Sequence, residues 1–197
     1  MPDKFKNRYL IASTRLPDWN YSDNGAYFLT ICTAHREHYF GEIVNSEMHL
    51  SIVGQFVNEC WKAIPNHFPY FFLDLFQIMP NHIHGIIVIN KLDSNNISVF
   101  DVAVETGHAL SLQQQTNADK QTTKPAHFRF RNQGRNTISA AIGSFKSAVT
   151  KYCNENQMES EWQPRFHDHV IQDPEEFYSI RNYIINNPRN WKDDRFY

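Results

Sequence analysis

The chain has 197 residues, of which 41% are hydrophobic and 20% are charged. This is an ordinary globular composition, and the length favours one domain over 1–197 with a sizeable core. The apolar runs are too short to cross a bilayer, and the N-terminus has no signal-peptide pattern. Three widely spaced cysteines argue against a disulfide framework or a structural zinc site. We therefore expect a cytoplasmic protein with no membrane association.

The charges are unevenly distributed along the chain. The formal net charge is only −2, but residues 120–154 contain seven cations and no acid, whereas acids gather at 93–105 and 155–176. Phosphate binding depends on such local positive potential rather than on the total charge. A basic loop that is merely solvated is an equally good interpretation of this segment.

Alternating apolar residues, helical periodicity and turn residues predict the elements before residue 90. They are a strand over 25–33, a hairpin of 38–44 and 48–50 with its turn at Asn45-Ser46, a helix over 53–64 ended by Pro65, and two antiparallel strands over 71–79 and 82–89.

The polar stretch over 91–136 has weak periodicity and is predicted to be a variable insertion or linker. An amphipathic helix over 138–152 and a strand over 162–171 follow it. Asp173-Pro174 then begins a helix that ends near Asn187. The resulting order, βαββαβ plus a final helix, predicts an α+β ferredoxin-like sandwich, in which helices back one antiparallel sheet. Many functions share this fold, so it does not decide the function.

Two histidines lie two apart in the last predicted strand before the insertion. Residues two apart in a strand share a face, so His82 and His84 project together and Ile83 projects to the opposite side. Two converging imidazoles can form half of a divalent-metal site. The alternative is a polar pair on a solvated strand face, since His-x-His also arises by chance. We interpret the second pair, His167 and His169, as structural or supporting.

The last predicted helix carries a tyrosine and an asparagine on one face. Tyr183 and Asn187 are four residues apart, and the apolar stripe through Phe177 and Ile184 places Tyr183 at its edge. A tyrosine hydroxyl there could attack a phosphate and leave a covalent phosphotyrosine. The amide oxygen of Asn187 could bind a hard cation. Alternatively, Tyr183 buries its ring at the core edge and Asn187 only ends the helix.

Taken together, these strings resemble the HUH single-tyrosine transposases, and most closely the branch of REP-associated tyrosine transposases. The resemblance covers roughly residues 21–191, with 91–136 unmatched. The strings are 25–33, 80–87 (Pro-Asn-His-Ile-His-Gly-Ile-Ile), 143–151 (Gly-Ser-Phe-Lys-Ser-Ala-Val-Thr-Lys), Trp162-Gln163 and 183–188 (Tyr-Ile-Ile-Asn-Asn-Pro).

The resemblance implies the sandwich of HUH endonucleases and a metal-dependent single-stranded DNA endonuclease and strand transferase that forms a 5′-phosphotyrosine on hairpin-forming DNA. His82 and His84 would bind Mg²⁺ or Mn²⁺, and Tyr183 would be the nucleophile. Asn187 stands where many insertion-sequence relatives carry a glutamine ligand, and it is one methylene shorter. Relatives act as homodimers or as monomers. The DNA backbone would be held by Lys146, Lys151, Arg129, Arg131 and Arg135.

Two other functions remain open from the sequence. A hydrolytic metalloenzyme built on His82 and His84 would have a third His, Asp or Glu ligand in place of Asn187 and would not need Tyr183. A non-catalytic single-stranded nucleic-acid-binding module would bind without metal and would never form a covalent adduct.

Overall fold

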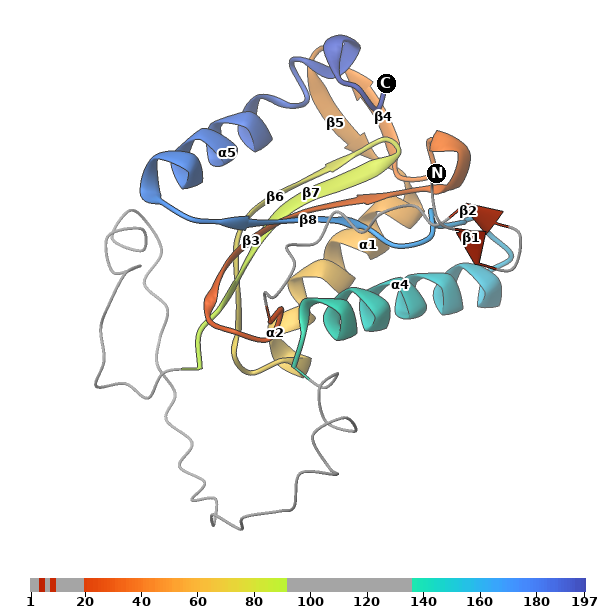
Figure 1. Cartoon of the computed structure of the whole chain (residues 1–197). Coiled ribbons are helices and arrows are strands. Elements are labelled where there is room, and N and C mark those ends of the chain that lie inside the picture. The colour runs from red at the N-terminus through yellow and green to blue at the C-terminus, as the bar shows by residue number, and fades with distance from the viewer. Residues whose placement is uncertain (1–3, 6–7, 10–19, 92–135) are drawn as a thin grey trace.

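The computed structural model describes residues 4–5, 8–9, 20–91 and 136–197. Its main sheet has four antiparallel strands in the order β6-β7-β3-β8 (Figure 1). Two small two-stranded sheets pair β1 with β2 and β4 with β5. The strands are β1 (Lys4–Phe5), β2 (Arg8–Tyr9), β3 (Gly25–Cys32), β4 (Gly41–Val44), β5 (Glu47–Leu50), β6 (Phe71–Met79), β7 (His82–Ile89) and β8 (His167–Ile171).

Helices cover both faces of the main sheet. The helices α1 and α4 pack on one face, while α5 lies on the other (Figure 1). The α-helices of the described chain are α1 (Ile52–Lys62), α2 (Ile64–His67), α4 (Ile138–Glu155) and α5 (Pro174–Asn186), and short 3-10 helices span Ala34–Arg36 and Trp191–Asp193. The predicted α+β sandwich, an antiparallel sheet backed by helices, is thereby confirmed.

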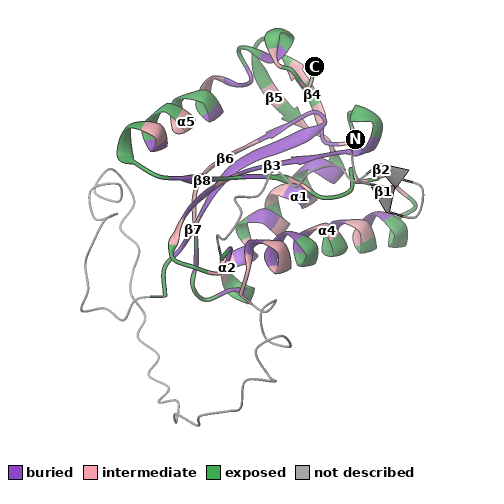
Figure 2. Cartoon of the chain, in the orientation of Figure 1, coloured by how far each residue is buried: buried purple, intermediate pink, exposed green. Residues whose placement is uncertain are grey.

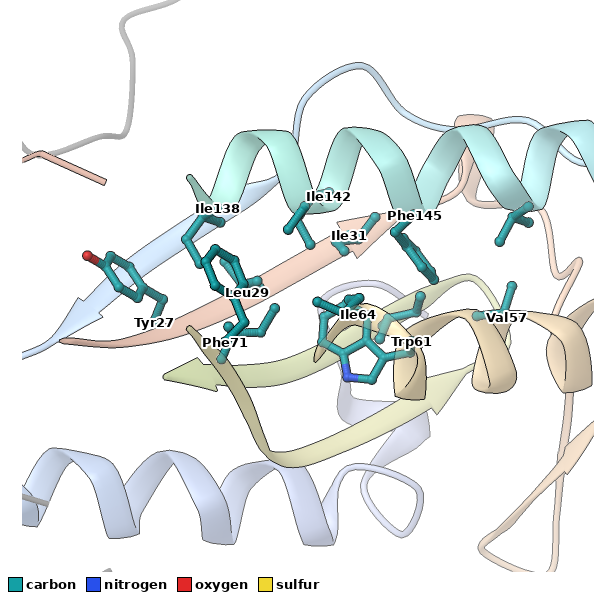
Figure 3. Close-up of a cluster of buried hydrophobic side chains, with 14 of the residues drawn as sticks. Tyr27, Leu29, Ile31, Val57, Trp61, Ile64, Phe71, Ile138, Ile142 and Phe145 are labelled. Atoms are coloured by element: carbon teal, nitrogen blue, oxygen red, sulfur yellow. The ribbon is translucent and has the colours of Figure 1, made fainter. Parts of the chain in front are cut away.

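The main core fills the space between the sheet and the helices α1 and α4 (Figures 2 and 3). Trp61 of α1 is fully buried there, and its ring meets Phe145 of α4 edge-on at 5.5 Å between centroids. Gly85 of β7 makes room for this indole, because a Cβ added at Gly85 would lie 2.5 Å from a ring carbon of Trp61. The close approach of α1 to β7 therefore requires glycine at this position.

A smaller apolar cluster holds α5 on the opposite face of the sheet. Its buried members come from β3, β7, β8 and α5, and they are Ala26, Ile86, Ile171, Phe177 and Ile184. Since side chains alternate along a strand, the β7 residues that flank Ile83 point toward this face and not toward the main core. The two histidines of β7 thus lie on the same side of the sheet as α5.

Several predicted boundaries differ from the structure, and among them the first hairpin strand, predicted over 38–44, begins only at Gly41. The predicted strand over 162–171 is wrong in its first half: Trp162 makes only an isolated bridge to Thr33, and β8 begins at His167. Arg165 has a φ of 68°, which interrupts extended backbone. The helix predicted over 53–64 ends at Lys62, and Pro65 lies in the first turn of α2 rather than after a helix end.

The hairpin turn is confirmed, because Asn45 and Ser46 have φ values of 51° and 65°, as a two-residue turn of type I′ requires. The predicted insertion over 91–136 lies almost entirely outside the described residues, and the single domain remains a prediction. No helix in the described ranges combines the length and apolar character needed to span a bilayer.

Candidate metal and tyrosine site

The two histidines of β7 form the centre of the candidate site. His82 and His84 are 0% and 1% exposed, and their ring centroids lie 4.4 Å apart. Ile83 between them belongs to the main core, as the alternation of the strand predicts. The alternative of two solvated histidines on a half-exposed strand is wrong, because both imidazoles are buried.

Asn81 determines which nitrogen of His82 is free. Its Nδ2 donates to the carbonyl oxygens of Arg36 at 3.2 Å and Phe196 at 2.8 Å, so its Oδ1 must be an acceptor. That Oδ1 lies 2.8 Å from Nδ1 of His82. Nδ1 therefore carries the proton, and Nε2 keeps a lone pair for a metal ion.

His84 is oriented by the neighbouring strand and contacts the tyrosine. Its Nδ1 lies 2.9 Å from Oγ1 of Thr30, which is its register partner on β3. When Nδ1 donates to Thr30, Nε2 is an acceptor, and the hydroxyl of Tyr183 lies 3.1 Å from it. Helix α5 thus brings Tyr183 to the histidine pair, although the two segments are 99 residues apart in sequence.

Asp194 is a member of the site that the sequence did not predict. Its Oδ2 accepts from Nδ2 of Asn187 at 2.6 Å and lies 3.4 Å from the hydroxyl of Tyr183. Its Oδ1 accepts from the backbone N–H of Phe196 at 2.7 Å. One carboxylate therefore connects the tyrosine, the asparagine and the C-terminal segment.

Aromatic residues dock this C-terminal segment on the histidines. Trp191 is buried, and its ring centroid lies 5.7 Å from that of His38 and 5.9 Å from that of His82. The ring of Phe196 lies 4.8 Å from that of His82. The aromatic residues that follow the last helix, Trp191, Phe196 and Tyr197, are the sequence feature that agrees with this packing, because buried aromatic rings contribute large apolar contacts.

The residues present fit a divalent cation. His82, His84 and Asp194 each offer a ligand atom, and these atoms lie within 4.8 Å of one another, so this group could hold a metal ion. Among the described residues, neither the buried Nε2 of His82 nor the buried Oδ1 of Asn187 makes a hydrogen bond of good geometry, although Asn187 lies close enough to His82 to raise its pKa. Buried polar atoms without partners are costly, and a cation would satisfy both. Asn187 as a ligand stays a prediction.

Burial and charge shift the pKa values in the site. Burial lowers the pKa of His82 to about 3 and lowers that of His84 well below its ordinary value, with nearby His82 adding to the second shift. Both imidazoles are therefore neutral at pH 7, as metal ligation requires. Burial, followed by the charge of Asp194, raises the pKa of Tyr183 to about 12, so the phenol keeps its proton at neutral pH.

Two arginines lie close to the site. The guanidinium carbons of Arg36 and Arg195 lie 6.0 and 4.6 Å from the ring centroid of Phe196, and both charges act on His82 by lowering its pKa. Neither arginine was selected from the sequence, because their distance from the histidines in the chain hides this proximity.

The predicted DNA-binding lysines lie on α4, on the other face of the sheet from α5 (Figure 1). Lys146 donates to the carbonyl oxygens of Gln163 and Arg165, whereas Lys151 is exposed. A shallow hollow of about 460 Å³ runs along this helix and is lined by Lys146, Ser147, Thr150, Lys151, Asn154 and Glu155. The predicted contacts of Arg129, Arg131 and Arg135 lie outside the described residues.

The second His-x-His pair does not join the candidate metal group. Nε2 of His169 lies 2.6 Å from Oε1 of Glu176 in the first turn of α5. The backbone N–H of Gln172 donates to the same carboxylate and is the main reason why the pKa of Glu176 is lowered. The contact between His169 and Glu176 therefore connects β8 to α5.

Comparison with known proteins places the chain in a family. No protein-family model matches it. It is 34% identical over 186 residues to an uncharacterized protein of Haemophilus influenzae, covering 94% of this chain and 92% of that protein. The chain belongs to the same family as this protein.

The fold is also found among solved structures. A REP-associated tyrosine transposase bound to a REP hairpin matches with a TM-score of 0.56 over 92% of this chain and 74% of that chain. The sequence identity is 16%, so the likeness is one of fold. It agrees with the antiparallel sheet backed by helices that is described above.

Proposed function

We propose that this protein is a metal-dependent single-stranded DNA endonuclease and strand transferase, a transposase whose nucleophile is Tyr183. The observation that carries the proposal is the convergence of the Tyr183 hydroxyl, 3.1 Å from Nε2 of His84, with a His-His-Asp group whose two histidines are buried. The shared fold with a tyrosine transposase bound to a REP hairpin supports it. Hairpin-forming DNA is accordingly the proposed substrate.

The proposed reaction is a transesterification at one phosphodiester. The oxygen of Tyr183 attacks the phosphorus, the bond to the 3′ oxygen breaks, and the phenol proton is lost while the leaving oxygen becomes a 3′-OH. The product is a 5′-phosphotyrosine, and attack by another 3′-OH reverses the step without an external energy source. His82, His84 and Asp194 would hold a divalent ion, with Asn187 beside them, and the ion would offset the negative charge that develops on the phosphate.

The protein residues around the site prepare this step. Asn81 and Thr30 orient the two imidazoles, and the buried surroundings exclude water from them. Because the phenol pKa is about 12, Tyr183 stays protonated until positive charge enters the site. Arg36 and Arg195 supply positive charge at its edge and are proposed to attract the DNA phosphates.

A metal-dependent hydrolase is the second candidate, and Asp194 favours it. A third ligand of the Asp type, rather than an asparagine, is what a hydrolytic site built on these histidines predicts. In that reaction a water molecule would attack the phosphate and Tyr183 would be dispensable. The two candidates therefore differ in what happens when the tyrosine hydroxyl is removed.

The test is to incubate the protein with a labelled library of single-stranded hairpins and Mg²⁺ or Mn²⁺, and to look for a denaturant-resistant protein–DNA adduct. Wild type is compared with Tyr183→Phe and with the double variant His82→Ala, His84→Ala. Tyr178→Phe is the matched control, because Tyr178 is a similarly exposed tyrosine of the same helix.

An adduct that maps to Tyr183 and is retained only in wild type and Tyr178→Phe supports the strand transferase. Cleavage that persists in Tyr183→Phe rejects it in favour of the hydrolase. Binding without cleavage under either metal rejects both and favours a non-catalytic nucleic-acid-binding module.

A further inference from the structure

A partly buried ion pair joins α5 to the edge strand β6. Nη1 of Arg181 lies 2.5 Å from Oδ1 of Asp74, and the two side chains are 28% and 22% exposed. Asp74 lies at the irregularity of β6, where the register with β7 shifts between Leu73 and Phe76. The irregular strand thus presents a carboxylate to the helix that carries Tyr183.

The ion pair and the tyrosine lie on opposite flanks of α5. Arg181 and Tyr183 are two residues apart, which corresponds to about 200° of rotation around the helix. The buried stripe through Phe177 and Ile184 runs between them and faces the sheet. Any rotation of α5 about its own axis that lifts the Arg181 flank away from the sheet therefore moves the Tyr183 flank toward the sheet, and the reverse rotation does the opposite.

The tyrosine flank has a polar contact of its own, with the other edge strand. Glu176 precedes Tyr183 by seven residues and so shares its flank, and it contacts His169 of β8. The two edge strands of the sheet, β6 and β8, thus each make a polar side-chain contact with α5. The apolar stripe contributes non-directional contact, whereas the polar side-chain contact at each flank is directional.

We propose that Asp74 and Arg181 are positioning residues that fix the rotation of α5 and thereby hold the Tyr183 hydroxyl at the histidines. This inference rests on the proposed function. A side-chain atom about 6 Å from the helix axis moves about 1 Å when the helix rolls by about 10°. A displacement of that size can slow a reaction about 100-fold.

The experiment measures single-turnover adduct formation at saturating DNA, and DNA affinity separately. The variants are Arg181→Gln, Asp74→Asn and the swapped double variant Asp74→Arg, Arg181→Asp. Lys62→Gln and Glu59→Gln make the same charge changes at exposed positions of α1, on the opposite face, and serve as controls. Circular dichroism and thermal unfolding identify any variant that does not fold.

Each single variant is expected to lose up to about 100-fold in adduct rate while DNA affinity stays at the wild-type value. The conservative changes Arg181→Lys and Asp74→Glu, and the swapped pair if it folds, are expected to recover part of the rate. If the ion pair only stabilised the fold, the variants would instead lose thermal stability, and their adduct rate and DNA affinity would fall together. Wild-type adduct rates in folded Arg181→Gln and Asp74→Asn would overturn the proposal.

A second readout does not depend on catalysis. Tetranitromethane nitrates exposed phenols, and peptide mass mapping gives the extent of nitration at Tyr183 relative to Tyr178. A changed rate of Tyr183 nitration in both single variants is expected, because a roll of α5 in either direction moves the phenol relative to His84 and Asp194. Unchanged nitration overturns the positioning role. If wild type forms no adduct, the proposed function fails, and nitration alone still decides this inference.

Discussion

At the scale of single residues, Asn81 controls the chemistry of His82 without being a ligand. Its amide fixes the proton on Nδ1 of His82 and is itself held by two backbone carbonyls. Replacing such a supporting residue typically lowers metal affinity about 10- to 100-fold. We therefore expect Asn81→Ala to weaken Mn²⁺ binding by that factor, as measured by isothermal titration calorimetry.

The control for this prediction is Thr33→Val. The Thr33 hydroxyl contacts the backbone oxygens of Glu37 and Asn81, so its loss perturbs the same loop but leaves the amide at His82 in place. Equal losses of affinity in both variants would mean that Asn81 acts only by supporting the loop.

The buried state of His82 predicts how stability changes with pH. In the unfolded chain its pKa is about 6.5, whereas burial lowers it to about 3 in the folded protein. Between these values the unfolded state binds more protons, so the stability contributed by this group is complete above pH 6.5 and is lost as the pH falls toward 3. We expect the free energy of unfolding of the metal-free protein to fall between pH 7 and pH 4.5.

Urea titrations at several pH values measure this slope. His82→Asn should show a shallower decline than wild type, because the variant has no imidazole to protonate at this position. An identical decline in the two proteins would assign the acid sensitivity to other groups.

At the scale of elements, two glycines allow a matched test of how α1 packs on β7. An alanine Cβ at Gly85 would lie 2.5 Å from the Trp61 ring, whereas one at Gly143 of α4 meets nothing within 4 Å. Gly85→Ala should therefore lower the free energy of unfolding by about 1–3 kcal/mol through overpacking. Gly143→Ala should raise it by up to about 1 kcal/mol through helix propensity.

Chemical denaturation of both variants measures whether the free energy of unfolding falls in Gly85→Ala and rises in Gly143→Ala. A neutral effect of Gly85→Ala would show that Trp61 can move aside without cost. A loss at Gly143 would show that the outer surface of α4 is covered by another part of the chain.

The elements that the sequence predicted well are those whose bounds are set by neighbouring residues in the chain, such as capping residues. The helix α5 begins where Asp173-Pro174 indicates, and the Asp173 side chain caps it by accepting from the N–H of Glu176. The strand predicted over 162–171 is too long at its N-terminal end, because β8 begins at His167. Trp162 instead packs in a loop against Phe40 and Phe145, at 5.4 and 5.7 Å between ring centroids. Such tertiary contacts leave no periodic pattern.

At the scale of the whole molecule, the candidate site combines segments that are remote in sequence. The alternation along one strand was enough to predict that His82 and His84 share a face, and helical spacing was enough to pair Tyr183 with Asn187. Asp194 could not be found in this way, because its place depends on how the segment after α5 folds back over β7.

Asp194 can be tested against its neighbour in the chain. Asp194→Asn removes a charged oxygen from the candidate metal group, and we expect Mn²⁺ affinity to fall at least about tenfold. Asp193→Asn makes the same chemical change at an exposed residue and should leave the affinity unaltered. Calorimetry on both variants measures this difference, and equal affinities would exclude Asp194 as a ligand.

The topology of the sheet also implies an order of folding. The strands β6 and β7 are joined by a tight turn, so the hairpin that bears the histidines forms through local contacts. By contrast, β3 must find β8 across the chain, since Ala26 pairs with Ile171. Contacts between such remote segments form slowly, and α5 directly follows β8. We therefore expect both imidazoles to be in place on the sheet before the tyrosine reaches them, and pulse-labelling hydrogen exchange that protects β6 and β7 before α5 would show this order.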